Sequence, residues 1–340
     1  MSKIGIGIIG TGSIVNTYAK CIEELGSAEL IALYTKSPNR AKQAEAEFGV
    51  PVISNMAEFL ALQEINLVCV CNESGRHGEA IKAAAIAGKH LLSEKPLEVT
   101  TEKIDEVISV CEDQNVKLGC VLQNRCSPDY RLVENAVKTG KLGKLIMGNA
   151  HINWYRSEDY YAKSEWRGTM QFDGGAAFMN QGIHTIDLLT NIMGTVKSVF
   201  GNIKTSVHHI EGEDVGSAIL NFSDGAIGNI TAGTALYPGY PERLEFYGEK
   251  GSILMEGGKI VHWNVQDAPS PELQSNDNPG SGAADPTAIG HQNHKTVIAD
   301  MVDAILNDNL PMVDGTEARK AVAVITAIYE SSKKEQLVHL

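Results

Sequence analysis

The chain has 340 residues, 43% hydrophobic and 21% charged, which is the balance of a soluble globular protein large enough for two domains. Its 29 basic and 42 acidic residues give a formal net charge of −13, which argues against nucleic acid as a partner. The six cysteines form no CxxC pair, which favours reduced thiols over a metal site. Without a run of about 18 apolar residues or a signal-peptide pattern, we expect no membrane partner and a cytoplasmic location.

Residues 1–123 alternate strand-like and helix-like segments. Apolar runs at 3–10, 28–35, 65–71, 89–93 and 116–122 predict strands, with a short strand at 51–53. Helices are predicted between them at 13–25, 37–49, 77–88 and 101–114. This alternation predicts right-handed crossovers and an α/β fold, a Rossmann domain with a doubly wound parallel sheet.

Residues 124–340 have a different pattern and predict a second domain of the α+β class with a large, mostly antiparallel open sheet. Helices are expected at 130–139 and 174–193, followed by strands at 196–203, 216–223, 226–234, 243–249, 251–257 and 259–264. The turns "SDG" and "EGGK" suit tight hairpins. Residues 264–289 are interpreted as a long loop, and two helices at 294–306 and 316–332 end the chain.

The glycine-rich start of the chain offers two frames for a phosphate loop. The match to GxGxxG at Gly5, Gly7 and Gly10 lies inside the first predicted strand and is rejected. Dinucleotide binding needs glycines at the turn from strand to helix, where backbone N–H groups meet a pyrophosphate. The frame that meets this need runs Gly10-Thr11-Gly12-Ser13-Ile14-Val15, with Val15 where a third Gly or Ala is usual.

The end of the second predicted strand bears on the choice of cofactor. NAD-binding folds usually carry an acidic residue there to bind the ribose hydroxyls. This chain has no acid at that place, but has Lys36, Ser37 and, just beyond, Arg40, which could hold a 2′-phosphate. The alternative is that these are solvated charges at a helix start. We therefore favour NADP over NAD.

The predicted helix at 174–193 carries a polar stripe. Asn180, His184 and Asp187 are spaced i, i+4 and i+7 and face one way on a helix. A lone histidine on such a helix is more often a core residue, but polar neighbours on the same stripe suit a site for proton transfer. Gln123 and Asn124 end the last Rossmann strand, where ligands bind in such sheets.

Aromatic and basic residues of the second predicted domain are candidates for a substrate or cofactor wall. Tyr161, Trp166 and Arg167 belong to this set, although packing explains the two aromatics equally well. Arg125 and Arg156 could meet a substrate anion.

Several motifs together resemble the glucose–fructose oxidoreductase / inositol dehydrogenase / MocA family of NAD(P)-dependent oxidoreductases. The resemblance runs end to end and includes "GIIGTGSIV", "HLLSEKPLEV", "DGGAAFMNQGIHTIDLL" and "VDGTEARKAVAVITAIYESS". The combination of "EKP" with the Gly-Gly…His-x-x-Asp helix is specific to the family. "WYRSEDYYAKSEWRGT" followed by "NQGIHTIDLL" is most similar to its sugar-nucleotide branch, such as the UDP-N-acetylglucosaminuronate 3-dehydrogenases.

This resemblance implies roles for particular residues. Lys95 would sit beside the nicotinamide, with the Lys95–Pro96 peptide often cis, and His184 would be the general acid/base. Many members carry Asp where this chain has Asn180, which can orient a hydroxyl but cannot relay a proton. Further cofactor contacts are expected from Asn72, Ser74, His77 and Glu94, although a structural hydrogen bond is our preferred interpretation of His77. Asp187 is expected to be structural.

We expect a dehydrogenase that transfers hydride between NAD(P) and a secondary alcohol or ketone of a sugar, cyclitol or sugar nucleotide. The alternatives are NAD-dependent redox-assisted glycoside hydrolysis and a non-catalytic dinucleotide-sensing regulator, against which Lys95 and His184 count. The predicted sheet lacks helices for both faces, and Ile219, Phe222, Ile227 and Ile230 supply apolar surface. With the resemblance, this predicts a homodimer or homotetramer through that sheet.

Overall fold

The computed structural model describes residues 3–271 and 290–340, and it divides the chain into two compact units. Unit 1 comprises Met1–Gln123 and His291–Arg319, and unit 2 comprises Asn124–Gly290 and Lys320–Leu340. The sequence places everything after residue 123 in the second domain, whereas helix α9 (Gln292–Leu306) packs against α1 (Ile14–Glu24) within unit 1. Part of the loop expected at 264–289 lies outside the described residues.

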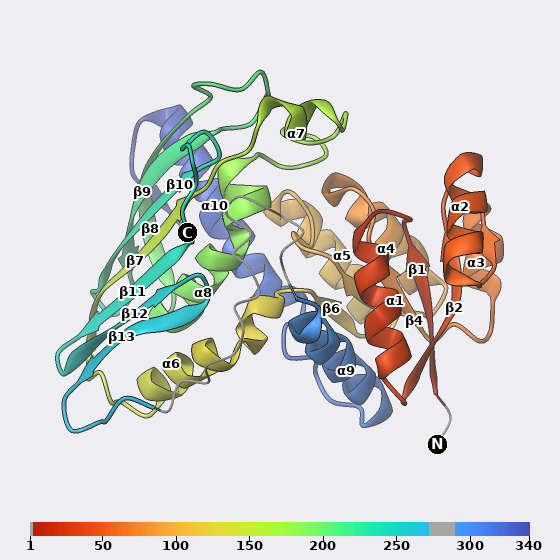
Figure 1. Cartoon of the computed structure of the whole chain (residues 1–340), viewed down its shortest axis with the longest axis horizontal. Coiled ribbons are helices and arrows are strands. Elements are labelled where there is room, and N and C mark those ends of the chain that lie inside the picture. The colour runs from red at the N-terminus through yellow and green to blue at the C-terminus, as the bar shows by residue number, and fades with distance from the viewer. Residues whose placement is uncertain (1–2, 272–289) are drawn as a thin grey trace. The chain divides into compact units, whose positions relative to one another are not determined.

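Unit 1 is built on a six-stranded parallel sheet in the order β3-β2-β1-β4-β5-β6, with helices on both faces (Figure 1). The strands are β1 (Ile4–Ile9), β2 (Ala28–Tyr34), β3 (Val52–Ile53), β4 (Leu67–Val70), β5 (His90–Ser93) and β6 (Leu118–Cys120). The helices besides α1 and α9 are α2 (Pro38–Phe48), α3 (Met56–Ala61), α4 (His77–Ile86) and α5 (Thr101–Asp113). This strand order is that of dinucleotide-binding folds, and the predicted Rossmann sheet is confirmed.

Unit 2 contains an eight-stranded, mostly antiparallel sheet in the order β13-β12-β11-β7-β10-β9-β8-β14. The strands are β7 (Leu145–Asn153), β8 (Val196–Lys204), β9 (Val215–Phe222), β10 (Ile227–Gly233), β11 (Arg243–Gly248), β12 (Gly251–Glu256), β13 (Lys259–Val265) and β14 (Val338–His339). Its helical elements include α6 (Pro128–Lys138), α7 (Glu158–Ala162), α8 (Ile183–Met193) and most of α10 (Gly315–Lys334). The six strands predicted between residues 196 and 264 are present, as are both hairpins.

Unit 2 differs from the sequence-based expectation in several features, including α7 and β14, which were not predicted. Strand β7 was not predicted, although it lies in the middle of the sheet between β11 and β10. The helix expected at 174–193 is divided into a π-helical turn, η3 (Ala177–Gly182), and the α-helix α8. Helix α8 packs directly on β7 at Gly148, where a Cβ atom would lie 2.7 Å from Sδ of Met193.

The two faces of the large sheet have different surroundings. Helices α8 and α10 lie against one face (Figure 1), where Phe222 and Ile230 are buried. Ile219 and Ile227 point to the opposite face and are 48% and 44% exposed. The four residues named in the sequence analysis therefore divide between the faces, because alternate residues of a strand point in opposite directions. No described helix covers the face of Ile219 and Ile227.

Candidate active site

The turn between β1 and α1 has the geometry that a phosphate loop requires. Gly10 has φ +120°, and a Cβ at this position would lie 2.6 Å from the carbonyl oxygen of Cys71. A Cβ at Gly12 would meet nothing within 4 Å, which leaves room for a ligand. Helix α1 begins directly afterwards, with no acidic residue in its first turn and no side chain capping its N-terminus. Unsatisfied N–H groups at such a helix start favour an anion.

The glycines of the rejected frame serve the packing of the sheet. A Cβ at Gly5 would lie 1.9 Å from the carbonyl oxygen of Glu64, and one at Gly7 would lie 2.6 Å from the ring of Phe59. Both glycines belong to β1, which is buried on both faces. They are required for close packing inside unit 1 and lie away from the turn.

Three buried oxygen atoms of unit 1 have no hydrogen-bond partner among the described residues. They are Oγ1 of Thr11, Oδ1 of Asn72 and Oε1 of Gln123. Thr11 follows β1, Asn72 follows β4 and Gln123 follows β6, so all three come after the carboxyl ends of strands. Because buried polar atoms in folded proteins normally have partners, these atoms fit a polar ligand at this edge of the sheet. The residues present therefore suit a dinucleotide.

The end of β2 places two cations at the surface. Lys36 and Arg40 are exposed, and Ser37 accepts a hydrogen bond from the backbone N–H of Arg40 as the N-cap of α2. The hydroxyl of Thr35 accepts a hydrogen bond from the N–H of Ser37, 3.3 Å away. The Ser37 hydroxyl that was expected at a 2′-phosphate is thus engaged locally, whereas both cationic heads reach solvent.

The loop after β5 carries Lys95, which is half-buried and precedes the cis peptide to Pro96 that the resemblance implies. Beside it, the Glu94 carboxylate accepts hydrogen bonds from the Tyr18 hydroxyl at 3.0 Å and from the Lys95 N–H at 3.3 Å. His294 Nε2 lies 3.9 Å from the same carboxylate. Glu94, expected to contact cofactor, is therefore held by α1 and by its own loop, and it fixes the backbone at Lys95.

His77 links two loops of unit 1 that carry predicted cofactor contacts. Its Nδ1 lies 2.8 Å from the carbonyl oxygen of Pro96, and its Nε2 lies 3.1 Å from that of Asn72. Burial lowers the pKa of His77, so the neutral ring donates to one of the two carbonyl groups. The contacts support the structural role that was preferred for this residue. Ser74, one turn earlier, is buried.

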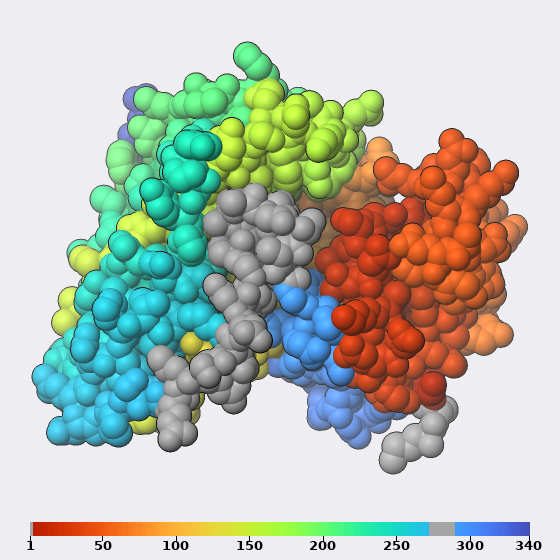
Figure 2. Space-filling view, in the orientation of Figure 1, coloured from red at the N-terminus to blue at the C-terminus, as the bar shows by residue number. Residues whose placement is uncertain are grey.

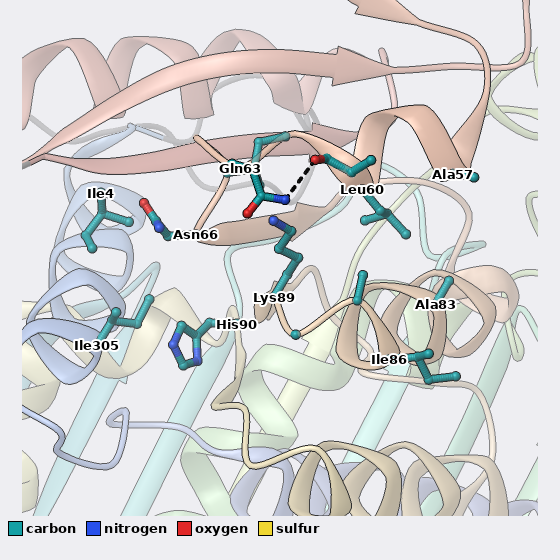
Figure 3. Close-up of a pocket in the computed structure, with 14 residues that line it drawn as sticks. Ile4, Ala57, Leu60, Gln63, Asn66, Ala83, Ile86, Lys89, His90 and Ile305 are labelled. Carbon is teal, nitrogen blue, oxygen red and sulfur yellow. Dashed lines mark hydrogen bonds between the residues drawn. The ribbon is translucent and has the colours of Figure 1, made fainter.

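A groove of about 730 Å³ lies at the opposite edge of the unit 1 sheet (Figure 3). It lies near the amino ends of β1 and β5, at Ile4 and His90. The buried Lys89 donates a hydrogen bond to the carbonyl oxygen of Leu62 across 2.9 Å. In open α/β sheets ligands bind outside the carboxyl ends of the strands, so this groove lies at the edge where a dinucleotide does not bind.

In unit 2, η3 and α8 leave two side chains accessible. Within the described stretch from Asp173 to Thr190, only Asn180 and His184 are not buried. A π-turn, a feature frequent at functional sites, carries Asn180, and α8 carries His184. Asp187 lies deeper and forms a bidentate ion pair with Arg125, with contacts of 2.8 and 2.6 Å. Arg125, first considered for a substrate anion, is therefore buried against a carboxylate.

The backbone of η3 is held by the buried carboxylate of Glu213. This side chain accepts hydrogen bonds from the N–H groups of Phe178 and Ala176 at 2.7 and 3.3 Å, and from the hydroxyl of Tyr329 at 2.9 Å. Burial raises the pKa of Glu213 to about 7, although these hydrogen bonds oppose the shift. The residue fixes the backbone of the turn that bears Asn180.

Arginine and aromatic side chains cluster around α7, next to the loop after β10. The yellow-green segment that includes α7 lies at the surface of unit 2 (Figure 2). The Arg167 guanidinium is half-buried and lies 4.4 Å from the centroid of the Tyr160 ring, with Trp166 at 5.5 Å. Arg156, by contrast, is 3% exposed and lies 5.1 Å from the centroid of Trp154. Of the three arginines predicted near substrate, Arg125 and Arg156 are buried, and Arg167 is the accessible one.

Other predicted wall residues have structural partners. Tyr161 is buried, and its hydroxyl donates to that of Thr234 at 2.8 Å. Asn124 is half-buried at the start of unit 2. Sequence analysis did not assign roles to Tyr160, Gln181 or Glu213. Two signals were available: Gln181 follows Asn180 in "NQG", and Glu213 belongs to an acidic pair directly before β9.

Two family models and several known proteins match this chain. The model of an oxidoreductase family with an NAD-binding Rossmann fold matches residues 4–121, and the GFO/IDH/MocA C-terminal domain matches residues 130–254. The myo-inositol 2-dehydrogenase of Thermotoga maritima is 27% identical over 257 residues, which cover 74% of this chain and 75% of that protein.

Solved structures extend the likeness over the whole chain. The WlbA dehydrogenase from Bordetella pertussis, in complex with NADH and UDP-GlcNAcA, is 30% identical with a TM-score of 0.91, covering 100% of this chain and 98% of that one. Levoglucosan dehydrogenase in complex with NADH and L-sorbose is 19% identical with a TM-score of 0.85, covering 100% of this chain and 99% of that one, and shows the fold alone. In the described residues, no helix is both long and apolar enough to cross a membrane.

The substitution Glu213→Gln tests the buried carboxyl beneath η3. Because burial raises the pKa of Glu213 from 4.5 to about 7, the folded chain keeps a proton that the unfolded chain has already lost. Its contribution to stability is therefore present at low pH and lost as the pH rises through about 7. Between about pH 4.5 and pH 7, we expect the free energy of unfolding of the wild type to fall by about 3 kcal/mol more than that of the variant.

Urea unfolding followed by circular dichroism at a series of pH values measures this difference. Glu165→Gln, at an exposed position of the same unit, is the matched control and should keep the wild-type slope. Parallel pH profiles for the wild type and Glu213→Gln would contradict the assignment.

Proposed function

Because the chain belongs to the GFO/IDH/MocA family of NAD-binding oxidoreductases, we propose that its substrate is a nucleotide-linked sugar acid. The family assignment makes it a dehydrogenase that transfers hydride between a nicotinamide cofactor and a CH–OH group of a sugar, cyclitol or sugar nucleotide. The observation that carries the reaction type is the accessible pair Asn180 and His184 on the otherwise buried stretch of η3 and α8.

The family resemblance suggests a role for each residue, and the chemistry of its side chain suits that role. When bound, the nicotinamide supplies the hydride acceptor. His184 takes the proton of the substrate hydroxyl at a ring nitrogen, Lys95 stabilises the developing negative charge on that oxygen, and Asn180 orients the hydroxyl. Gly10, Thr11, Gly12, Asn72 and Gln123 hold the dinucleotide.

The acidic character of the substrate is supported by Arg167 and by one relative. Arg167 presents a half-buried guanidinium, stacked on Tyr160, that suits a carboxylate or phosphate. The relative that is 30% identical was crystallised with UDP-GlcNAcA, which combines both kinds of anion. An acidic sugar nucleotide therefore matches the described charges better than a neutral cyclitol.

The cofactor is proposed to be NADP in preference to NAD. Lys36 and Arg40 at the end of β2 are exposed cations, with no acidic residue at the end of this strand to bind ribose hydroxyls. Relatives have been crystallised with NADH, so the choice rests on these two side chains.

Lys95→Met tests the proposed reaction. Removal of the cation should lower turnover of UDP-linked N-acetylhexosaminuronate on the order of 10²–10³-fold, because charge on the reacting oxygen is no longer stabilised. The measurement is the absorbance of the reduced cofactor with a panel of nucleotide sugars, free sugar acids and inositols. Lys82→Met, on the surface of α4, is the matched control.

Near-normal turnover by folded Lys95→Met would remove Lys95 from the mechanism. Release of a free nucleotide diphosphate or aglycone without net change of cofactor would instead identify redox-assisted cleavage. Cofactor binding without turnover of any alcohol would favour a sensor.

Calorimetry with NADPH and NADH tests the cofactor choice. The wild type should bind NADPH more tightly, and the double substitution Lys36→Ala with Arg40→Ala should weaken NADPH on the order of tenfold or more, because the 2′-phosphate loses its cations. NADH affinity should change little in the same variant and serves as the internal control. Tighter NADH binding by the wild type would refute the preference.

The uncovered face of the unit 2 sheet is proposed to pair with a second copy of the chain. Phe200, Ile219 and Ile227 are 46%, 48% and 44% exposed, and Phe200 pairs with Ile219 across neighbouring strands. An exposed apolar sheet face of this kind is typical of an isologous interface.

Light scattering should give at least twice the chain mass of 36.6 kDa at micromolar concentration. Ile219→Glu with Ile227→Glu should dissociate the assembly, because a like-charged face resists burial. Ile86→Glu, at an even more exposed apolar residue of unit 1, should leave the mass unchanged. A monomeric wild type would rule out the pairing.

A further inference from the structure

Four polar side chains of unit 2 form a continuous hydrogen-bonded chain through the candidate active site. The Asn180 Nδ2 donates to Oδ1 of Asp173. The Gln181 Nε2 donates to Oδ1 of Asn180 at 3.0 Å, and Oε1 of Gln181 accepts from a terminal nitrogen of Arg156 at 2.7 Å. The chain therefore runs from a carboxylate through two amides to a guanidinium.

The charges at the two ends fix the direction of both amides. A carboxylate only accepts hydrogen bonds, so the Asn180 amide must turn its NH₂ group toward Asp173 and its oxygen toward Gln181. A guanidinium only donates, so Gln181 must turn its oxygen toward Arg156 and its NH₂ group toward Asn180. Each end alone gives the same order of nitrogen and oxygen in both amides.

The members of this chain are buried except for Asn180. Asp173 is 1% exposed, Arg156 is 3% exposed and Gln181 is 8% exposed. Buried charges require hydrogen-bonded compensation, and two amides in series provide it between Asp173 and Arg156. The second oxygen of Asp173 accepts the N–H of Gly168 at 2.8 Å, so both carboxylate oxygens are engaged.

A branch connects the chain to the aromatic wall. The Gln181 Nε2 also donates to the hydroxyl of Tyr160 at 3.0 Å. The Tyr160 ring is the surface on which Arg167 lies. The orientation of Gln181 therefore affects the position of the Asn180 amide and, through Tyr160, the position of the Arg167 guanidinium.

We propose that Asp173 is a positioning residue that sets the orientation of the Asn180 amide and, through Gln181, holds Arg156 and Tyr160 in place. It acts on the substrate only through these residues. The inference rests on the proposed function for its catalytic consequence, since Asn180 is the member that orients the substrate hydroxyl.

The contact between Asp173 and Asn180 predicts that exchanging the two residue types restores what each single substitution loses. Asp173→Asn leaves one oxygen for two donors, the Gly168 N–H and the Asn180 NH₂ group, so a donor faces a donor. Asn180→Asp alone places a half-buried carboxyl group in contact with the buried one of Asp173, and one of the two must keep a proton. The double substitution Asp173→Asn with Asn180→Asp restores one donor, one acceptor and a single charge.

The experiment measures melting temperature and steady-state kinetics of the wild type, both single variants and the double variant between about pH 5 and pH 9. Asn180→Asp should lose stability and turnover as the pH rises, because the shared proton is lost. The double variant should lack this added pH dependence. Asp173→Asn should lower turnover on the order of tenfold or more, and the double variant should recover most of that loss.

Neighbouring ionisable groups do not confuse the comparison. Arg156, Tyr160, Tyr161, Tyr329, Glu213 and His184 are the same in every variant. Burial raises the pKa of both Tyr161 and Tyr329 well above its ordinary value, so those two hydroxyls stay protonated over the range. Glu213 titrates in this range, and its contribution cancels when variants are compared at each pH.

Two results would overturn the proposal. One is a double variant that keeps the pH dependence of Asn180→Asp. The other is a double variant no more active and no more stable than Asp173→Asn, which would leave Asp173 with only its contact to Gly168. If the wild type turns over none of the sugar substrates, the proposed function fails, while the melting temperatures still decide the pairing. If Asp173→Asn does not fold, recovery of a folded double variant is itself the expected rescue.

Discussion

One buried carboxylate holds the backbone N–H groups of Ala176 and Phe178, and the candidate catalytic side chains of unit 2 depend on that contact. Glu213 reaches the backbone of η3 because two glycines, Gly174 and Gly175, precede that turn in the chain. A Cβ at Gly175, which has φ +133°, would lie 2.1 Å from the Tyr329 hydroxyl that also binds Glu213. The glycine pair lets an acid of the segment before β9 approach the turn, and η3 then presents Asn180 shortly before α8, which carries His184.

Much of this arrangement could be predicted because its signals are local. The strand-helix alternation of unit 1, the turn at Gly10 and the stripe of Asn180 and His184 each depend on residues close together in the sequence. Strand β7 was missed because Gly148 and polar residues interrupt its apolar pattern, and its place in the sheet follows from pairing with the distant strands β10 and β11. The assignment of α9 to unit 1 likewise depends on its contact with α1, a distant segment of the chain.

In the candidate site, too, contacts between distant parts of the chain could not be predicted from the sequence. Arg125 and Arg156 look alike in the sequence as cations available to a substrate, yet both are buried against acceptors of unit 2. A sequence gives the type of a side chain but not its burial, and burial decides whether an arginine binds a ligand or a neighbour. Conversely, Asp173 is seven residues from Asn180, a spacing that in a regular helix shares a face, but the glycine turn and η3 lie between them. Their contact therefore follows from the folded backbone and could not be derived from periodicity.

The resemblance noted that many family members carry Asp where this chain carries Asn180, and the structure gives a physical reason why that exchange is not neutral here. An aspartate at this position would face the buried Asp173, and two carboxylates in contact cannot both be ionised without a large penalty. The amide instead serves as donor to one neighbour and acceptor from the other, which a carboxylate cannot do at neutral pH. The identity of residue 180 is thus tied to that of residue 173. A chain that keeps a carboxylate at both positions must hold a proton between them, and that proton would add a pH dependence that the contact between Asp173 and Asn180 does not have.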